Sequence, residues 1–144
     1  MMTVRSSLLG VFVLAAVLSF VVSAAAQTTA GLHIPRQGSA ERKAILDALR
    51  TDDQVSFKVH FLKVHNGWAW IDVTPLGKDG KPVAEGGPSL LHHEQGEWKV
   101  QDLSKVPEDP HDPLGPEDAS RGFVRNLRKT FPGVPADIFP KPKH

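Results

Sequence analysis

The chain contains no cysteine. It therefore has no disulfide, no thiolate nucleophile and no cysteine-ligated metal site, and its fold must be held together by its apolar core. An excess of charge of either sign is also missing, because 17 basic residues balance 16 acidic ones. Nucleic-acid binding requires a concentrated patch of Lys and Arg. The charge balance therefore predicts no basic stripe and no nucleic-acid partner.

Long apolar runs are missing except at the N-terminus, where residues 8–22 follow a single basic residue. This run of about 15 residues is shorter than the roughly 20 that span a bilayer. The small residues of "SAAAQ" follow it, in the pattern that signal peptidases cleave. A signal peptide is therefore predicted over residues 1–26, with an uncleaved anchor helix as the alternative. The protein is expected in the periplasm or outside the cell, with no membrane span after cleavage.

Helices are predicted near both ends of the remaining chain. After a flexible lead over residues 27–38, Ser39 is a good N-cap, and apolar residues recur behind it with a helical period. A second helix is predicted over residues 117–131, because acidic residues open it and an apolar stripe runs along it. Residues 39–140 then form a single domain and residues 141–144 a tail. Ile138 and Phe139 are expected to pack against the core.

Two consecutive hairpins lie between the predicted helices. Asn66-Gly67 turns the first hairpin and Gln95-Gly96 turns the second, and Asn-Gly is the strongest signal for a two-residue hairpin turn. The strands are expected over residues 55–64, 68–74, 89–94 and 97–103, with 83–85 as an additional brief strand.

The apolar alternation of the first strand changes phase. Odd-numbered apolar residues run from Val55 to Phe61, and then Leu62 and Val64 are the next apolar positions. Either both faces of this strand are covered, or a β-bulge near residues 60–62 shifts its register. We favour the bulge.

This order of elements predicts an α+β fold, in which a four-stranded antiparallel sheet carries an N-terminal and a C-terminal helix on one face. A helix followed by four antiparallel strands resembles the cystatin-like and NTF2-like group, in which a curved sheet wraps a helix and often leaves a cavity. The stretch "GWAWIDVTPLGKDGKP…LLHHEQGEWKVQDL" is similar to small exported bacterial proteins of unknown function. That resemblance covers residues 39–139 and brings no catalytic residues with it.

Each hairpin places a histidine opposite a tryptophan. A two-residue turn pairs His65 with Trp68 and His93 with Trp98, at about 5 Å between Cβ atoms. Tryptophan offers a flat surface to a ligand, and histidine changes charge between about pH 5 and 8. With Trp70 on the same return strand, these residues predict a ligand-binding face. The alternative is that Trp98 belongs to the core and that His65 and Trp68 only stabilise the end of a hairpin.

His60 and Asp72 are the candidates for catalysis, because a His–Asp pair sometimes works inside the cone of the NTF2-like group. Strict pairing puts the two side chains on opposite faces, whereas a bulge at Phe61 brings them together. No phosphate loop, nucleophile elbow or paired-carboxylate motif is present. Seven histidines raise the question of a metal, but His92 and His93 are adjacent and point to opposite faces of a strand. No metal and no cofactor are predicted.

The favoured hypothesis is an exported, non-catalytic domain that binds a small ligand or a protein partner in the cell envelope. One alternative is an NTF2-like enzyme that uses His60 and Asp72 as an acid–base pair. Another is a structural or assembly accessory, in which the edge strand over residues 83–85 accepts a strand from a partner.

Overall fold

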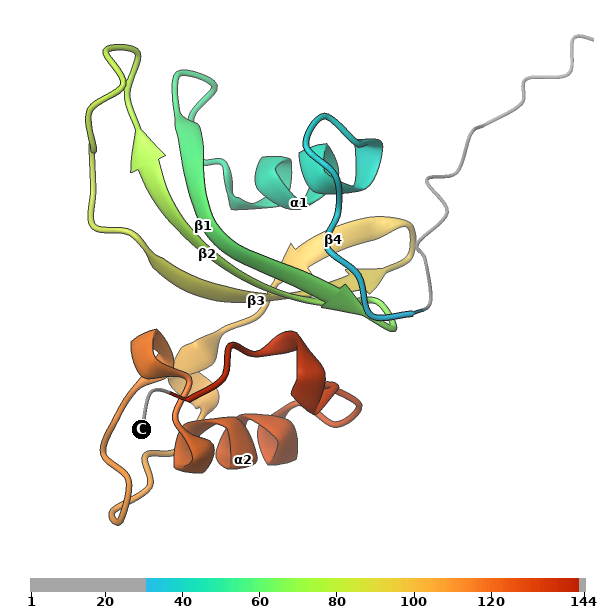
Figure 1. The fold of residues 1–144 in the computed structure, drawn as a ribbon, viewed down its shortest axis with the longest axis vertical. Helices are drawn as coiled ribbons and strands as arrows, with labels where there is room; N and C mark the ends of the chain where they lie inside the picture. Colours follow the sequence, from blue (N-terminus) through green and yellow to red (C-terminus); the bar gives the residue numbers. More distant parts are fainter. Residues whose placement is uncertain (1–30, 143–144) are drawn as a thin grey trace, which may run out of the picture.

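A computed structural model describes residues 31–142, so the signal peptide predicted over residues 1–26 lies outside the described residues. The strands form one antiparallel sheet in the order β1-β2-β3-β4 (Figure 1). The predicted α+β class, with a four-stranded antiparallel sheet and a helix at each end, is confirmed. The elements are α1 Ala40–Leu49, β1 Ser56–His65, β2 Trp68–Leu76, β3 Gly87–Glu94, β4 Glu97–Val100, η1 Leu103–Lys105, η2 Pro116–Asp118, α2 Arg121–Thr130 and η3 Ala136–Ile138.

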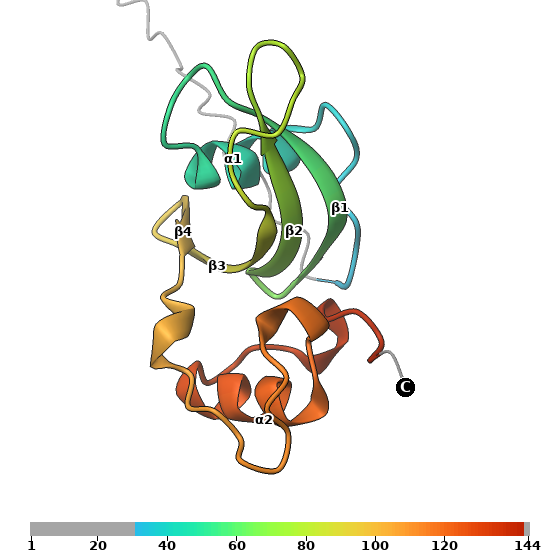
Figure 2. The same ribbon diagram turned by 90° about the vertical axis from the view of Figure 1, so that its left-hand side faces the viewer.

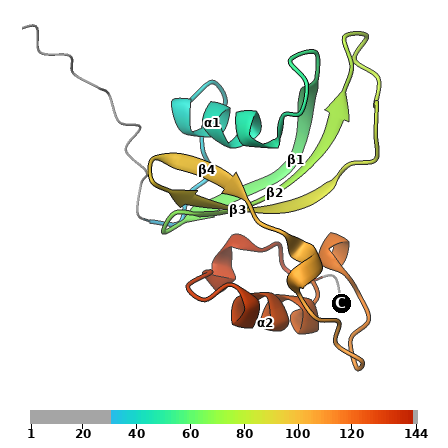
Figure 3. The same ribbon diagram turned by 180° about the vertical axis from the view of Figure 1, so that it is seen from behind.

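The two helices lie on opposite faces of the sheet (Figures 1 and 3). Ile45 of α1 belongs to a buried cluster with Ile71, whereas Trp70 belongs to a second buried cluster with Phe139 and the apolar side of α2. The expectation that both helices share one face is therefore wrong. The reason lies in residues 68–71 of β2, which are all buried. A strand that is apolar on both sides needs a covering layer on each.

The C-terminal part of the chain builds the second covering layer. Figure 2 shows η1, η2, α2 and η3 gathered together on the side of the sheet away from α1. Ile138 is fully buried and Phe139 is 6% exposed, so their predicted packing against the core is confirmed. A fold in which a curved sheet wraps a single helix would not contain this second layer.

The hairpin turns have the expected geometry. Asn66 and Gly67 have φ angles of 49° and 76°, and residues 95–96 have φ angles of 51° and 82°. Positive φ at both central positions defines the turn that matches the twist of the two strands. The predicted pairs of His65 with Trp68 and of His93 with Trp98 are confirmed.

β1 contains the predicted bulge. Its register against β2 shifts between Val59 and Phe61 and leaves His60 as the extra residue. Phe61 then packs against the cluster on the α2 face, whereas Leu62 belongs to the cluster on the α1 face. Both explanations of the change in phase are therefore correct, since the strand is bulged and also covered on both sides.

The second helix begins at Arg121, not at Glu117 as the sequence predicted. Pro116–Asp118 forms a short 3-10 turn, and Ala119 has a φ of 43°, which is left-handed and ends that turn. Ser120 then caps α2, because its Oγ accepts a hydrogen bond from Phe123 N at 3.3 Å. The proline and acidic start signals belong to the short turn.

The brief strand interpreted over residues 83–85 is absent from the described fold. Pro82 makes an isolated bridge with Leu76, and the next strand, β3, begins only at Gly87. Val83 N donates a backbone hydrogen bond to Pro75 O at 3.1 Å, but this contact does not extend into a strand. The expected strand over residues 83–85 is therefore wrong, and the role of this segment in accepting a partner strand stays a prediction.

His33 anchors the part of the lead that the structure describes. Its backbone pairs with Val64 through two hydrogen bonds of 2.9 Å. Its Nδ1 lies 2.6 Å from Gly31 O, and its Nε2 lies 2.7 Å from Glu41 Oε2. A carbonyl only accepts, so Nδ1 is the donor to Gly31 O, and the contact between Nε2 and the Glu41 carboxylate favours the protonated form of the ring. The ring thus links the lead to β1 and α1.

We predict that the stability contributed by His33 falls as pH rises. Burial lowers the pKa of the ring, but the hydrogen bonds to Gly31 O and Glu41 and the charge of Glu41 together raise it above its ordinary value of 6.5. Such a group contributes stability that is complete below the unfolded pKa and is lost as pH rises through the folded pKa.

Urea unfolding at about pH 6 and about pH 8.5 tests this expectation. The free energy of unfolding should fall more between the two conditions in the wild type than in His33→Asn. His111→Asn is the control, because that side chain is exposed in the proline-rich loop, residues 106–116. An identical pH dependence in the wild type and His33→Asn would contradict the prediction.

Candidate functional site

The three tryptophans of the predicted binding face lie in two separate clusters. Trp68 and Trp70 are buried between the sheet and α2, at 7% and 1% exposure. Trp98 is buried between the sheet and α1, at 8% exposure. The register explains the separation, because Trp68 lies opposite His92 and Trp98 lies opposite His93. Adjacent residues of a strand point to opposite faces, so the structure does not place the three rings on one surface.

The two predicted histidines follow their tryptophans to opposite sides. His65 Nδ1 lies 2.8 Å from Asp137 Oδ1, and the ring of His93 lies 5.1 Å from that of Trp98. Trp68 stacks on His92, with ring centroids 3.8 Å apart and planes 8° apart. This stack was not predictable from the sequence, because β2 and β3 are joined by a long loop. Such a loop does not fix the register in the way that a two-residue turn does. Contact of these side chains with a ligand stays a prediction.

The bulge leaves His60 exposed and hydrogen-bonded to a hydroxyl. His60 Nε2 lies 2.8 Å from Thr74 Oγ1, while Asp72 is half-buried opposite Phe61. A threonine hydroxyl orients the ring but supplies no carboxylate charge to an acid–base pair. An acid–base role for His60 and Asp72 therefore stays a prediction without a hydrogen bond between the two groups.

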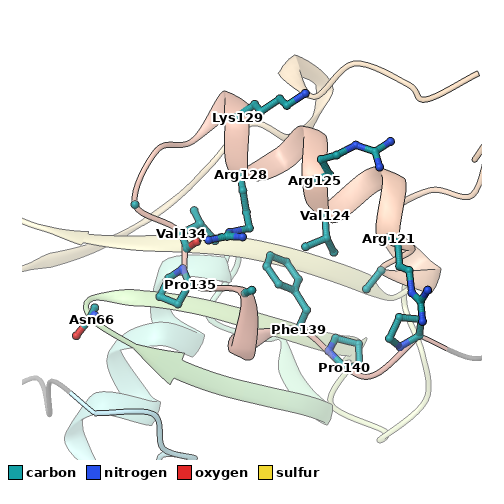
Figure 4. Close-up of a pocket in the computed structure, with 14 residues that line it drawn as sticks. Asn66, Arg121, Val124, Arg125, Arg128, Lys129, Val134, Pro135, Phe139 and Pro140 are labelled. Atoms are coloured by element: carbon teal, nitrogen blue, oxygen red, sulfur yellow. Dashed lines mark hydrogen bonds between the residues drawn. The ribbon is translucent and has the colours of Figure 1, made fainter.

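A different site appears on the α2 layer. A groove of about 780 Å³ runs between α2 and the C-terminal segment, residues 133–142. Figure 4 shows Arg128 beside Val134 and Pro135 at one end and Arg121 near Pro140 at the other. The apolar lining residues are Ala119, Val124, Val134, Pro135, Ala136, Phe139, Pro140 and Pro142.

The cations of this groove come from a single helix. α2 buries Phe123 and Leu127 against the core and turns its other side outward. Gly133, with a φ of 95°, reverses the chain after the helix, so the following residues return beside it. The basic side chains that line the groove are Arg121, Arg125, Arg128 and Lys129, and no acidic side chain is among the lining residues.

Two of the four cations already have partners within the protein. Arg125 forms an ion pair with the buried carboxylate of Asp109. Arg128 Nε donates a hydrogen bond to Val134 O at 2.9 Å, which leaves its two terminal nitrogens for other partners. Within residues 31–142, neither Arg121 nor Lys129 forms an ion pair. The groove therefore keeps a positive charge after its internal contacts are made.

This concentration of charge corrects the expectation of no basic stripe. The balance over the whole chain hid a local excess, because α2 carries four basic residues and no acidic one. The signal was available in the sequence: Arg121, Arg125 and Arg128 stand at i, i+4 and i+7, which share one face of a helix. The second wall was not predictable, since it depends on how residues 133–142 fold back.

In residues 31–142, no group of three or more His, Cys, Asp or Glu side chains is placed to hold a metal ion. Of the helices in that range, none has the length and apolar character to cross a membrane.

Fold and site together define an α+β domain, in which a four-stranded antiparallel sheet lies between two helical layers and a basic groove marks the second layer. Comparison of the chain with protein-family models, curated proteins and solved structures found no match. The resemblances to the cystatin-like and NTF2-like group and to small exported bacterial proteins therefore stay predictions.

Proposed function

We propose that this protein is an exported, non-catalytic domain that binds an anionic small ligand or an acidic protein partner in the cell envelope. The observation that carries the proposal is the groove beside α2, where four basic and no acidic side chains surround an apolar floor. Export is proposed on the apolar run and the small-residue cleavage pattern of the first 26 residues.

The groove has side chains that can bind the anionic part of such a ligand and side chains that can cover its apolar part. A guanidinium group binds carboxylate or phosphate through parallel charge-assisted hydrogen bonds, and Arg128 is held in place for this by its bond to Val134. The floor at Val124 and Phe139 can cover an apolar group. A volume of about 780 Å³ lies within the range of ligand-binding pockets.

A thermal-shift screen tests the proposal. The panel contains anionic and neutral sugars, peptidoglycan fragments, phospholipids, metals, and acidic and basic peptides. A ligand at 100 times its Kd stabilises the folded state by about 2.7 kcal/mol, which raises the Tm of a domain of this size by on the order of 10 °C. Anionic members of the panel should raise the Tm, whereas basic peptides should not.

We predict that Arg121→Gln combined with Arg128→Gln lowers the affinity for the best anionic ligand by about 100-fold, since each lost charge-assisted contact costs about a factor of ten. Isothermal titration at low and high salt measures this loss. Lys78→Gln is the matched control, because it removes one exposed charge from a loop outside the groove. A ligand that binds the double variant and the wild type equally well does not use this groove.

A further inference from the structure

We infer that the occupant of the groove is an acidic peptide segment of a partner protein, with two carboxylates that flank an apolar residue. This inference rests on the proposed function, since it concerns the same groove. The observation behind it is the arrangement of charge around the floor: Arg121 and Arg128 lie at opposite ends, with Val124 and Phe139 between them (Figure 4). Arg125 points away from Phe139 in the same view and is neutralised by Asp109.

The spacing of the two end arginines along α2 suits a peptide backbone. Arg121 and Arg128 stand at i and i+7 of α2, which separates their Cα atoms by about 10 Å along the helix axis. A peptide in the polyproline II conformation rises about 3.1 Å per residue with three residues per turn. Acidic residues at positions i and i+3 of such a peptide lie about 9 Å apart on the same side. Two such carboxylates match the spacing of Arg121 and Arg128 along α2, and a side chain between them points to another side of the backbone, where it can turn toward the wall that carries Phe139.

The walls of the groove also offer apolar surface to such a segment. Proline side chains at positions 135, 140 and 142 line it together with the ring of Phe139. A polyproline II segment is already extended before it binds, so little backbone entropy is lost when an apolar groove receives it. Arg128 is fixed by its hydrogen bond to Val134 O, so it too loses little freedom when a carboxylate binds.

Other anionic ligands match only part of the groove. A fatty acid or phospholipid has one anionic end, so its acyl chain would have to run past the second cation at the far end of the floor. A phosphate or sulfate polymer has many anions but no apolar group to cover Val124 and Phe139. A peptide supplies both carboxylates and an apolar side chain, at the spacing that the groove presents.

Fluorescence anisotropy with a labelled peptide tests the inference. The probe is Ser-Glu-Pro-Leu-Glu-Ser, and we expect it to bind the purified protein with a micromolar Kd. Replacement of both Glu by Gln should weaken binding by about 100-fold, and replacement of Pro-Leu by Ser-Ser by about tenfold. A peptide of the same composition with the two Glu adjacent, Ser-Pro-Leu-Glu-Glu-Ser, should also bind about tenfold more weakly. Equal binding of the two isomeric peptides would contradict the proposed spacing of the two carboxylates.

Single substitutions in the groove test whether the peptide probe binds there. Arg121→Gln and Arg128→Gln should each weaken the probe by about tenfold. Arg128→Lys keeps the positive charge but loses the two parallel N–H donors of the guanidinium group. Its affinity for the probe should therefore lie between those of Arg128→Gln and the wild type. Lys78→Gln should bind like the wild type, and thermal unfolding of each variant confirms that it is folded.

Two competing probes separate this inference from the proposed function. They are phosphatidylglycerol vesicles and inorganic polyphosphate. If either binds in an Arg121- and Arg128-dependent way while the peptide does not, the peptide inference is overturned and the proposed anionic ligand is retained. If no anionic probe depends on these two arginines, both proposals fall.

Discussion

Trp70→Ala is expected to lower the free energy of unfolding by about 3–5 kcal/mol, and Ile71→Ala by about 2–5 kcal/mol. These residues are neighbours in the chain, but Trp70 is 1% exposed in the α2 cluster and Ile71 is fully buried in the α1 cluster. Removing either side chain loses buried apolar area and leaves a cavity in a different core. Trp70 packs against Phe139, with ring centroids 4.9 Å apart, so its loss also loosens the C-terminal segment.

Together the two variants test whether both faces of the sheet are covered. A sheet with one covered face would tolerate one of these two substitutions, because consecutive strand residues point to opposite sides. Urea unfolding monitored by far-UV circular dichroism measures both. Val100→Ala is the control, since Val100 is 48% exposed on β4 and should change stability by less than about 0.5 kcal/mol. Little cost at either buried position would mean that one of the two cores does not form.

The hairpins were predictable because short-range chemistry determines them. Asn66-Gly67 fixes its own turn geometry, and the turn fixes every pair along β1 and β2 up to the bulge. The bulge was predictable too, since a change in apolar phase leaves few other arrangements. The helix N-cap at Ser39 follows the same logic, because its side chain accepts from Arg42 N three residues later.

The two-sided sheet and the groove depend on contacts that are distant in sequence. Alternating apolar residues show that a strand is buried, but they do not say which helix covers which face. Trp68 and Trp98 could share a surface only if β3 placed their partners on the same side. The register of β2 against β3, which follows a loop of ten residues between Leu76 and Gly87, places them on opposite sides. The groove requires in addition the reversal at Gly133.

Gly122→Ala is expected to lower the free energy of unfolding by about 2–4 kcal/mol, although alanine is the better helix former. A Cβ on Gly122 would lie 2.7 Å from Asp109 Oδ2 and 2.7 Å from both Cβ and Oδ2 of Asp112. The same glycine donates its backbone N–H to Asp112 Oδ2 at 2.6 Å. The added methyl group therefore pushes away the two carboxylates that fasten the proline-rich loop to α2.

A matched glycine and a double variant test this steric explanation. Gly87→Ala meets no atom within 4 Å and needs no unusual backbone angle, so it should be neutral or stabilise by up to about 1 kcal/mol. Asp112→Gly removes one source of the clash, so Gly122→Ala combined with Asp112→Gly should cost less than the sum of the two single changes. Strict additivity in urea unfolding would show that crowding at Asp112 is not the cause.

The same substitution connects the fold to the proposed site. Asp109 holds Arg125, and α2 carries Arg121 and Arg128 at fixed separation along the groove. Displacing the loop from Gly122 loosens the first turn of α2, where Arg121 is located. Gly122→Ala should therefore weaken binding of an anionic ligand even under conditions where the variant is fully folded, while Gly87→Ala should not. Unchanged affinity in folded Gly122→Ala would mean that the groove is positioned by the C-terminal segment alone and not by the carboxylate contacts at the start of α2.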